Sequence, residues 1–106
     1  MRHAHRSEPV MLELEKKHFD VVSGILARQV PGCRVWAFGS RVGGKPGKYS
    51  DLDLVLFFPV RPGLKRLEEL KLAFSESDLP FSVDLLDCEM VSPEFQAIIA
   101  ARHEAI

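Results

Sequence analysis

Two aspartates, Asp51 and Asp53, stand where a pair of carboxylates could bind a cation, at the start of the apolar run Leu52–Phe58. Residues two apart on a strand point to the same face, about 6.5–7 Å apart. Their carboxylates can therefore converge on one hard cation such as Mg²⁺, which prefers oxygen ligands. In the alternative, Asp51 caps a turn and Asp53 faces water at the end of a sheet. An unpaired carboxylate inside an apolar run is costly, and the pair by itself leaves both interpretations open.

A third aspartate, Asp84, is the only charged residue within the apolar segment Phe81–Leu86. If this segment forms a strand beside the one that carries Asp53, the third carboxylate joins the same site. Clustered carboxylates raise one another's pKa unless cations neutralise them. The three aspartates together therefore favour a divalent metal site, on the condition that the two strands pair.

The segment Phe38-Gly39-Ser40-Arg41 is the third feature that could carry chemistry. A glycine directly after a strand allows a tight turn and the close approach of a ligand. Ser40 offers a hydroxyl and an N–H group at a possible helix start, which suits an anion. Arg41, and Lys45 and Lys48 after it, supply local positive charge. The segment is not a Walker A motif, because Lys45 is followed by neither Ser nor Thr.

The elements that must position these residues follow from hydrophobic spacing. Apolar residues at steps of three and four predict an amphipathic helix of about 20 residues that opens at Pro9 and ends before Pro31-Gly32. His18 falls on its apolar stripe and is expected to pack as a neutral side chain. The patterns that follow predict strands at 33–38, 52–58 and 81–87 and helices at 64–74 and, after the cap Ser92-Pro93, up to about 102.

This alternation predicts an α/β (α+β) fold with a small mixed sheet and flanking helices. The 106 residues suit a single domain, 1–106, with 1–8 as a flexible tail. The strand at 52–58 is expected to be central and covered on both faces.

Composition limits the classes of function. Lys plus Arg total 14 and Asp plus Glu total 15, so the net charge is -1, and bulk attraction to nucleic acid is not expected. No secretory signal and no apolar run long enough to span a bilayer are visible, which predicts a cytoplasmic protein without membrane contact. Cys33 and Cys88 form no CxxC pair and are expected to be buried free thiols, with a disulfide as the alternative.

Taken together, Phe38–Arg41 and Ser50–Leu54 resemble the signature of the DNA polymerase beta-like nucleotidyltransferase superfamily, and in particular its minimal nucleotidyltransferases, the MNT domains. The twelve-residue step from Gly39 to Asp51 fits that signature. The resemblance implies that Gly39, Ser40 and Arg41 hold the phosphates of ATP. It also implies that Asp51, Asp53 and Asp84 bind two Mg²⁺ ions and that Asp84 lies nearest the acceptor hydroxyl.

MNT domains are commonly partnered with HEPN-domain proteins in toxin–antitoxin pairs. The resemblance therefore implies an antitoxin that transfers AMP from ATP to a hydroxyl of a HEPN ribonuclease toxin and so neutralises it. Two alternatives stay open: an antitoxin that only covers its toxin, and a nucleotidyltransferase for a small molecule. One departure concerns the phosphate loop, where the family often has a second arginine and this chain has Val42-Gly43-Gly44. Lys45 or Lys48 could supply that charge.

Overall fold

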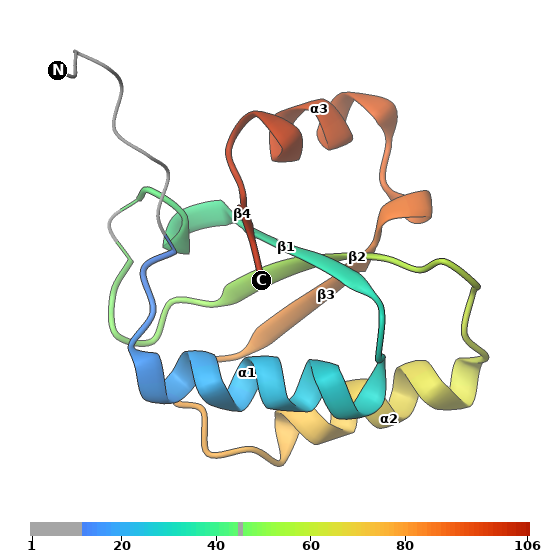
Figure 1. Ribbon diagram of the computed structural model, residues 1–106. Helices are drawn as coiled ribbons and strands as arrows, with labels where there is room; N and C mark the ends of the chain where they lie inside the picture. Colours follow the sequence, from blue (N-terminus) through green and yellow to red (C-terminus); the bar gives the residue numbers. More distant parts are fainter. Residues whose placement is uncertain (1–11, 45) are drawn as a thin grey trace, which may run out of the picture.

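A four-stranded mixed sheet forms the centre of the structure, a computed structural model that describes residues 12–44 and 46–106 (Figure 1). The strands of the described residues are β1 (Arg34–Phe38), β2 (Leu52–Phe57), β3 (Val83–Asp87) and β4 (Glu104–Ala105). The helices are α1 (Lys16–Gln29), α2 (Leu64–Ser75) and α3 (Pro93–Ala101), with single 3₁₀ turns η1 (Gly39–Arg41) and η2 (Cys88–Met90). The sheet order is β3-β2-β1-β4, and β2 pairs parallel to β3 while the other pairs are antiparallel. The predicted mixed α/β fold is confirmed.

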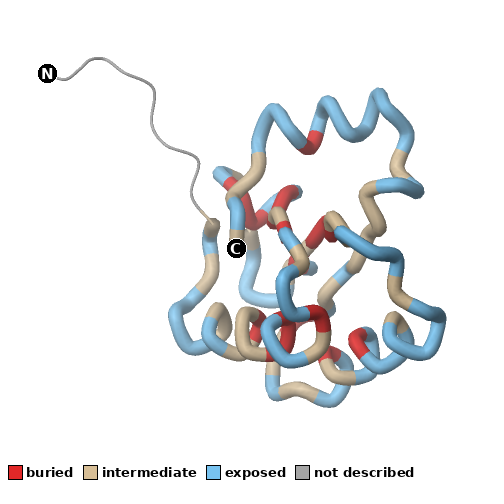
Figure 2. Tube along the Cα trace, turned by 45° about the vertical axis from the view of Figure 1, so that its right-hand side comes forward, coloured by how far each residue is buried: buried red, intermediate tan, exposed pale blue. Residues whose placement is uncertain are grey.

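The main core lies between one face of the sheet and the helices α1 and α2, which lie on the same side of it (Figure 1). Alternate residues of β2, Leu52, Leu54 and Leu56, are at most 2% exposed and point into this layer. Leu70 of α2 and Val22 of α1 are fully buried against them. Figure 2 shows the buried stretches concentrated in the middle strands and on the inner sides of these helices.

The opposite face of the sheet has a smaller cover, because α3 alone among the described helices lies over it (Figure 1). Ile99 of α3 packs with Phe38 and Val55 in a second buried cluster. Since β2 is buried on both faces at its centre, its nearly continuous apolar sequence is explained, and the expectation of a central, doubly covered strand is confirmed.

The crossover through α2 decides which strands are neighbours. Pro59, Pro62 and Gly63 follow β2 and end it before α2 begins at Leu64. The helix then returns the chain, so that β3 runs parallel to β2. This parallel pairing is the condition that the sequence left open for Asp84.

Two local predictions are confirmed in detail. The Ser92 hydroxyl accepts a hydrogen bond from the backbone N–H of Phe95 at 3.2 Å, and Pro93 occupies the first turn of α3. His18 packs edge-on against the ring of Phe81, with 5.6 Å between ring centroids.

The start of the first helix was predicted too early. Among the described residues, Leu12 forms an antiparallel bridge with Val42, and the Glu13 N–H donates to the Arg41 carbonyl. The segment 12–15 is therefore extended, and α1 begins at Lys16. Spacing of apolar residues cannot reveal a bridge to a loop about 30 residues away. Pro9 and the predicted tail 1–8 lie outside the described residues.

Three smaller expectations are also corrected. The possible helix after Ser40 is only the three-residue turn η1. Strand β4 was not predicted, because two residues carry no periodic signal. Cys33 and Cys88 are free thiols, but they are half-buried rather than buried.

None of the described helices is long and apolar enough to cross a membrane.

We expect Leu54→Ala to lower the free energy of unfolding by about 3 kcal/mol, because it leaves a cavity between β2 and the helix layer. Urea unfolding followed by circular dichroism measures the loss. Leu72→Ala is the control, since Leu72 is 54% exposed and its truncation should change stability by less than about 0.5 kcal/mol. Equal effects of the two variants would contradict this description of the core.

Candidate active site

Two carboxylates lie side by side on neighbouring strands. In the sheet register Asp53 of β2 is opposite Asp84 of β3, and Phe38, the last residue of β1, is opposite Asp53 on the other side. Adjacent strands are about 4.8 Å apart. The structure therefore brings Asp84 next to Asp53, as the sequence required for a shared site, and places the turn after Phe38 at the other end of the same row.

The environment of Asp53 disfavours its charged form. Burial, the negative charge of Asp84, a hydrogen bond between these two carboxyls and the charge of Asp51 together raise the pKa of Asp53 from 3.8 to about 6. Burial is the largest cause. Asp51 and Asp84 are exposed, whereas Asp53 is half-buried. A proton or a cation at Asp53 relieves this repulsion.

Gly39 brings the turn after β1 into contact with the Asp53 carboxylate. Its φ is +82°, in the left-handed region that favours glycine. A Cβ at this position would lie 2.3 Å from Oδ2 of Asp53. Any side chain here would occupy the space at the carboxylate, so the glycine keeps open a small cradle between the turn and Asp53.

The loop that follows lies close over Ser40. A Cβ on Gly44 would be 2.4 Å from the Ser40 carbonyl oxygen, so Gly44 allows the chain to fold back onto the turn. Gly43, at φ +71°, lies against the guanidinium of Arg102, which donates a hydrogen bond to the Gly43 carbonyl. Gly39 and Ser40 themselves stay exposed.

Arg41 occupies a different place from the one expected for a phosphate ligand. Its side chain is buried, with 6% of the residue exposed. Its guanidinium donates to four backbone carbonyls: Ser50 at 2.9 Å, Glu13 at 3.0 Å, Lys48 at 3.1 Å and Gly47 at 3.5 Å. It also lies over the ring of Phe81, 4.2 Å from the centroid. The contact of Arg41 with phosphate stays a prediction, and the geometry disfavours it because these donors already have partners.

Two other described residues bring positive charge near the turn: Lys48 and Arg102. The ammonium group of Lys48 lies 5.5 Å from the ring centroid of Tyr49, and Lys45 lies outside the described residues. Arg102, which the sequence analysis did not single out, reaches the same loop from the end of α3. No local signal could have revealed it, because 59 residues separate it from Gly43.

The residues present fit a hard divalent cation through their oxygen donors. Within residues 12–44 and 46–106, no three Asp, Glu, His or Cys side chains gather into a compact group able to hold a metal. Mg²⁺, however, is usually bound by one or two carboxylates and completes its shell with water and substrate phosphates. The neighbouring carboxylates of Asp53 and Asp84, beside the cradle at Gly39, suit that mode. Participation of Asp51 stays a prediction.

Comparison with known sequences gives two consistent matches. A family model described as nucleotidyltransferase domain matches residues 20–105. A Haemophilus influenzae protein named probable protein adenylyltransferase MntA is 48% identical over 88 residues, which cover 83% of this chain and 77% of the relative.

Solved structures share the fold at low sequence identity. One is from the complex of a tri-AMPylated HEPN toxin of Shewanella oneidensis with MNT antitoxin. It matches with a TM-score of 0.64 and 19% identity, over 87% of this chain and 71% of its own. Another Shewanella oneidensis crystal structure matches with a TM-score of 0.61 and 18% identity, over 86% and 71% of the two chains.

We expect Asp53→Asn to raise the melting temperature of the metal-free protein at pH 7.5 by a few degrees. Because the pKa of Asp53 is higher in the folded chain, its stabilising contribution is complete below about pH 3.8 and is lost as pH rises through about 6. The difference from wild type should therefore shrink toward pH 4. Melts in chelator at both pH values measure it, with exposed Asp78→Asn as the control. A wild type as stable as Asp53→Asn at pH 7.5 would contradict the repulsion.

We expect Arg41→Lys to destabilise the fold by about 2 kcal/mol, because an ammonium group cannot reproduce the planar set of donors that reaches four carbonyls. Urea unfolding measures the loss. Arg28→Lys on the exposed side of α1 is the matched control and should be nearly neutral. An equally neutral Arg41→Lys would show that the guanidinium contacts do not hold the loop.

Proposed function

Because this chain belongs to the nucleotidyltransferase domain family, we propose that it transfers AMP from ATP to a hydroxyl group of a partner protein. The sequence analysis predicted membership of a nucleotidyltransferase family, and this prediction is confirmed. Support for a protein acceptor comes from the Haemophilus influenzae relative, whose name is that of a protein adenylyltransferase.

The observation that carries the proposal is the pairing of Asp53 with Asp84 on neighbouring strands, with the turn residue Gly39 against the Asp53 carboxylate. A nucleotidyl transfer needs a place for the phosphates, a place for the reacting phosphorus and a place for the incoming hydroxyl. The exposed turn at Gly39 and Ser40 suits the phosphates, since its backbone can approach them closely. Asp84, exposed and on the edge strand, suits the incoming hydroxyl.

In the proposed reaction, the acceptor oxygen forms a bond to the α-phosphorus of ATP. The bond between that phosphorus and the oxygen bridging to the β-phosphate breaks, and its electron pair leaves with pyrophosphate. Asp84 orients the acceptor hydroxyl and takes its proton. Positioning and charge stabilisation supply most of the lowering of the barrier, so few side chains are needed.

We propose that Asp51, Asp53 and Asp84 hold two Mg²⁺ ions. When bound, such ions neutralise the triphosphate and lower the pKa of the acceptor hydroxyl. The role of Asp53 is then to bind a cation, whose positive charge offsets the burial and the neighbouring negative charges that raise the pKa of this carboxyl. Gly39 leaves the space at the Asp53 carboxylate free for this group and for the phosphates.

The partner that we propose is a HEPN-domain toxin, with this chain as the antitoxin. The complex from Shewanella oneidensis supports this choice, because there a tri-AMPylated HEPN toxin is found with an MNT antitoxin. We propose that the chain acts as a single domain in the cytoplasm, and that modification of the toxin, rather than coverage of it, causes neutralisation.

A labelling experiment tests the proposal. The chain is incubated with Mg²⁺, α-labelled ATP and a HEPN-domain protein from the same genome, and we expect label on that protein with a mass increase of one or more AMP groups. Asp53→Ala should lower the rate at least about 100-fold, because charge stabilisation at the phosphorus is lost, and chelator should do the same. Asp78→Ala, on the exposed segment after α2, should keep the wild-type rate.

Three outcomes would contradict the proposal in different ways. Inhibition of the toxin without label would indicate that binding alone neutralises it. Label on a small molecule in place of the protein would indicate the small-molecule alternative. Full Mg²⁺-dependent transfer by Asp53→Ala would show that the carboxylate row is not the active site.

A further inference from the structure

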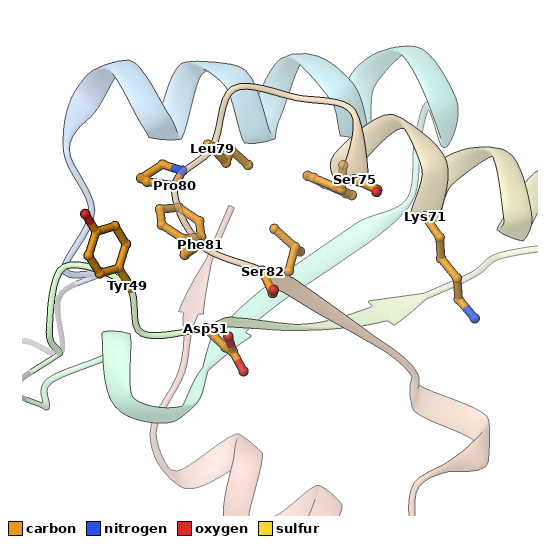
Figure 3. Close-up of a pocket in the computed structure, with 10 residues that line it drawn as sticks. Tyr49, Asp51, Lys71, Ser75, Leu79, Pro80, Phe81 and Ser82 are labelled. Atoms are coloured by element: carbon orange, nitrogen blue, oxygen red, sulfur yellow. The ribbon is translucent and has the colours of Figure 1, made fainter.

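A groove of about 480 Å³ opens beside the free edge of the sheet (Figure 3). It lies between the C-terminal half of α2, the segment that leads into β3 and the residues just before β2. The side chains that matter for its chemistry are those of Tyr49, Asp51, Lys71, Pro80, Phe81 and Ser82. Its volume is within the usual range for ligand sites, about 300–1,000 Å³.

The groove meets the proposed active site at one side only. Asp51 lines it, and Ser82 and Val83, which also line it, directly precede Asp84. Within the described part of the chain, the turn Gly39–Arg41 contributes nothing to its lining. The backbone N–H of Leu52, the residue after Asp51, donates a hydrogen bond to the Ser82 carbonyl at 2.9 Å. A molecule in the groove would therefore reach the carboxylates from the β3 side, away from the turn proposed for the phosphates.

The strand order indicates from which side the acceptor approaches the reacting phosphorus. Across the sheet the order is the turn after β1, then Asp53 on β2, then Asp84 on β3. In phosphoryl and nucleotidyl transfer the incoming and leaving oxygens lie roughly in line on opposite sides of the phosphorus. If pyrophosphate leaves toward Gly39 and Ser40, the acceptor oxygen arrives from the β3 side. The groove opens at that edge of the sheet, on the face that α2 covers, next to Ser82 and Val83.

The free edge of β3 indicates what kind of molecule the acceptor is. Among the described strands, β3 is the last on its side of the sheet, so its outer N–H and C=O groups can pair with an extended peptide. Tyr49 is 67% exposed and, with Pro80, offers an apolar contact, while Lys71 adds a cation to the lining. A backbone edge, the exposed ring of Tyr49 and the cation of Lys71 together suit a polypeptide segment with an acidic residue.

We propose that this groove binds the segment of the partner protein that carries the acceptor hydroxyl, with Lys71 facing an acidic residue of that segment. The inference rests on the proposed transfer of AMP to a protein and adds to it the place where the acceptor binds. The acceptor strand would lie along β3, and its hydroxyl would reach the phosphorus past Asp51 and Asp84.

Two variants test the groove by different physical means. Ser82→Trp fills it, and Lys71→Glu reverses its charge. Each should raise the KM for the HEPN-domain acceptor about tenfold or more, as expected for a central contact of an interface, and leave the KM for ATP within about twofold of wild type. Matched controls on the exposed side of α2, Leu72→Trp and Lys65→Glu, lie outside the groove lining and should behave as wild type in both measurements. Thermal melts establish that each variant is folded.

The outcomes separate this inference from the proposed function. If the groove variants raise the KM for ATP as much as the KM for the acceptor, the groove holds the nucleotide. If both variants keep wild-type KM values, the acceptor binds elsewhere. Either result overturns the inference. If wild type transfers no label at all, the proposed function fails. The groove is then tested by titrating the HEPN-domain protein into the chain. Weaker binding by Ser82→Trp and Lys71→Glu than by their controls supports the groove as the partner's site, and equal binding rejects it.

Discussion

The repulsion between two carboxylates held on adjacent parallel strands is the constraint on which the rest of this structure depends. Asp53 and Asp84 are direct neighbours in the sheet, and burial together with this repulsion raises the pKa of Asp53 to about 6. The sheet forms despite the repulsion between these carboxylates. Leu52 and Leu54, the residues on either side of Asp53, are fully buried in the core that α1 and α2 cover. Burial of each of these leucine side chains stabilises the fold by about 2 kcal/mol, which opposes the local cost of the carboxylate pair.

The two faces of the sheet have different roles because the helices are distributed unequally. Two helices, α1 and α2, cover one face and form the main core, while α3 covers the other face around Ile99. The carboxylates belong to this second, less covered face, at the end of the strands where Gly39 leaves β1. A face that is apolar at one end and open at the other can stabilise the fold and still expose charged groups to a ligand.

Arg41, the charged residue after Gly39-Ser40, contributes to the structure by donating hydrogen bonds to backbone carbonyls. Its guanidinium joins the segment before α1, the loop before β2 and the ring of Phe81. The carbonyl of Ser50 is among its acceptors, so Arg41 positions the residue directly before Asp51. Burial lowers its pKa, but an arginine remains charged at neutral pH, and the partial charges of four carbonyls compensate that charge.

The sequence by itself determined most of the local elements and which residues on them are candidates for a site. Apolar spacing predicted the three strands on which the candidate residues lie, and the pair Ser92-Pro93 predicted the cap of the last helix. Residue types alone singled out the three aspartates and the turn at Gly39 as candidates. Only the tertiary structure decided that Asp84 is the neighbour of Asp53, that Arg41 faces carbonyls rather than solvent, that α1 begins at Lys16, and that a groove follows the edge of β3. Each of these depends on contacts between segments far apart in the sequence, and local periodicity contains no information about such contacts.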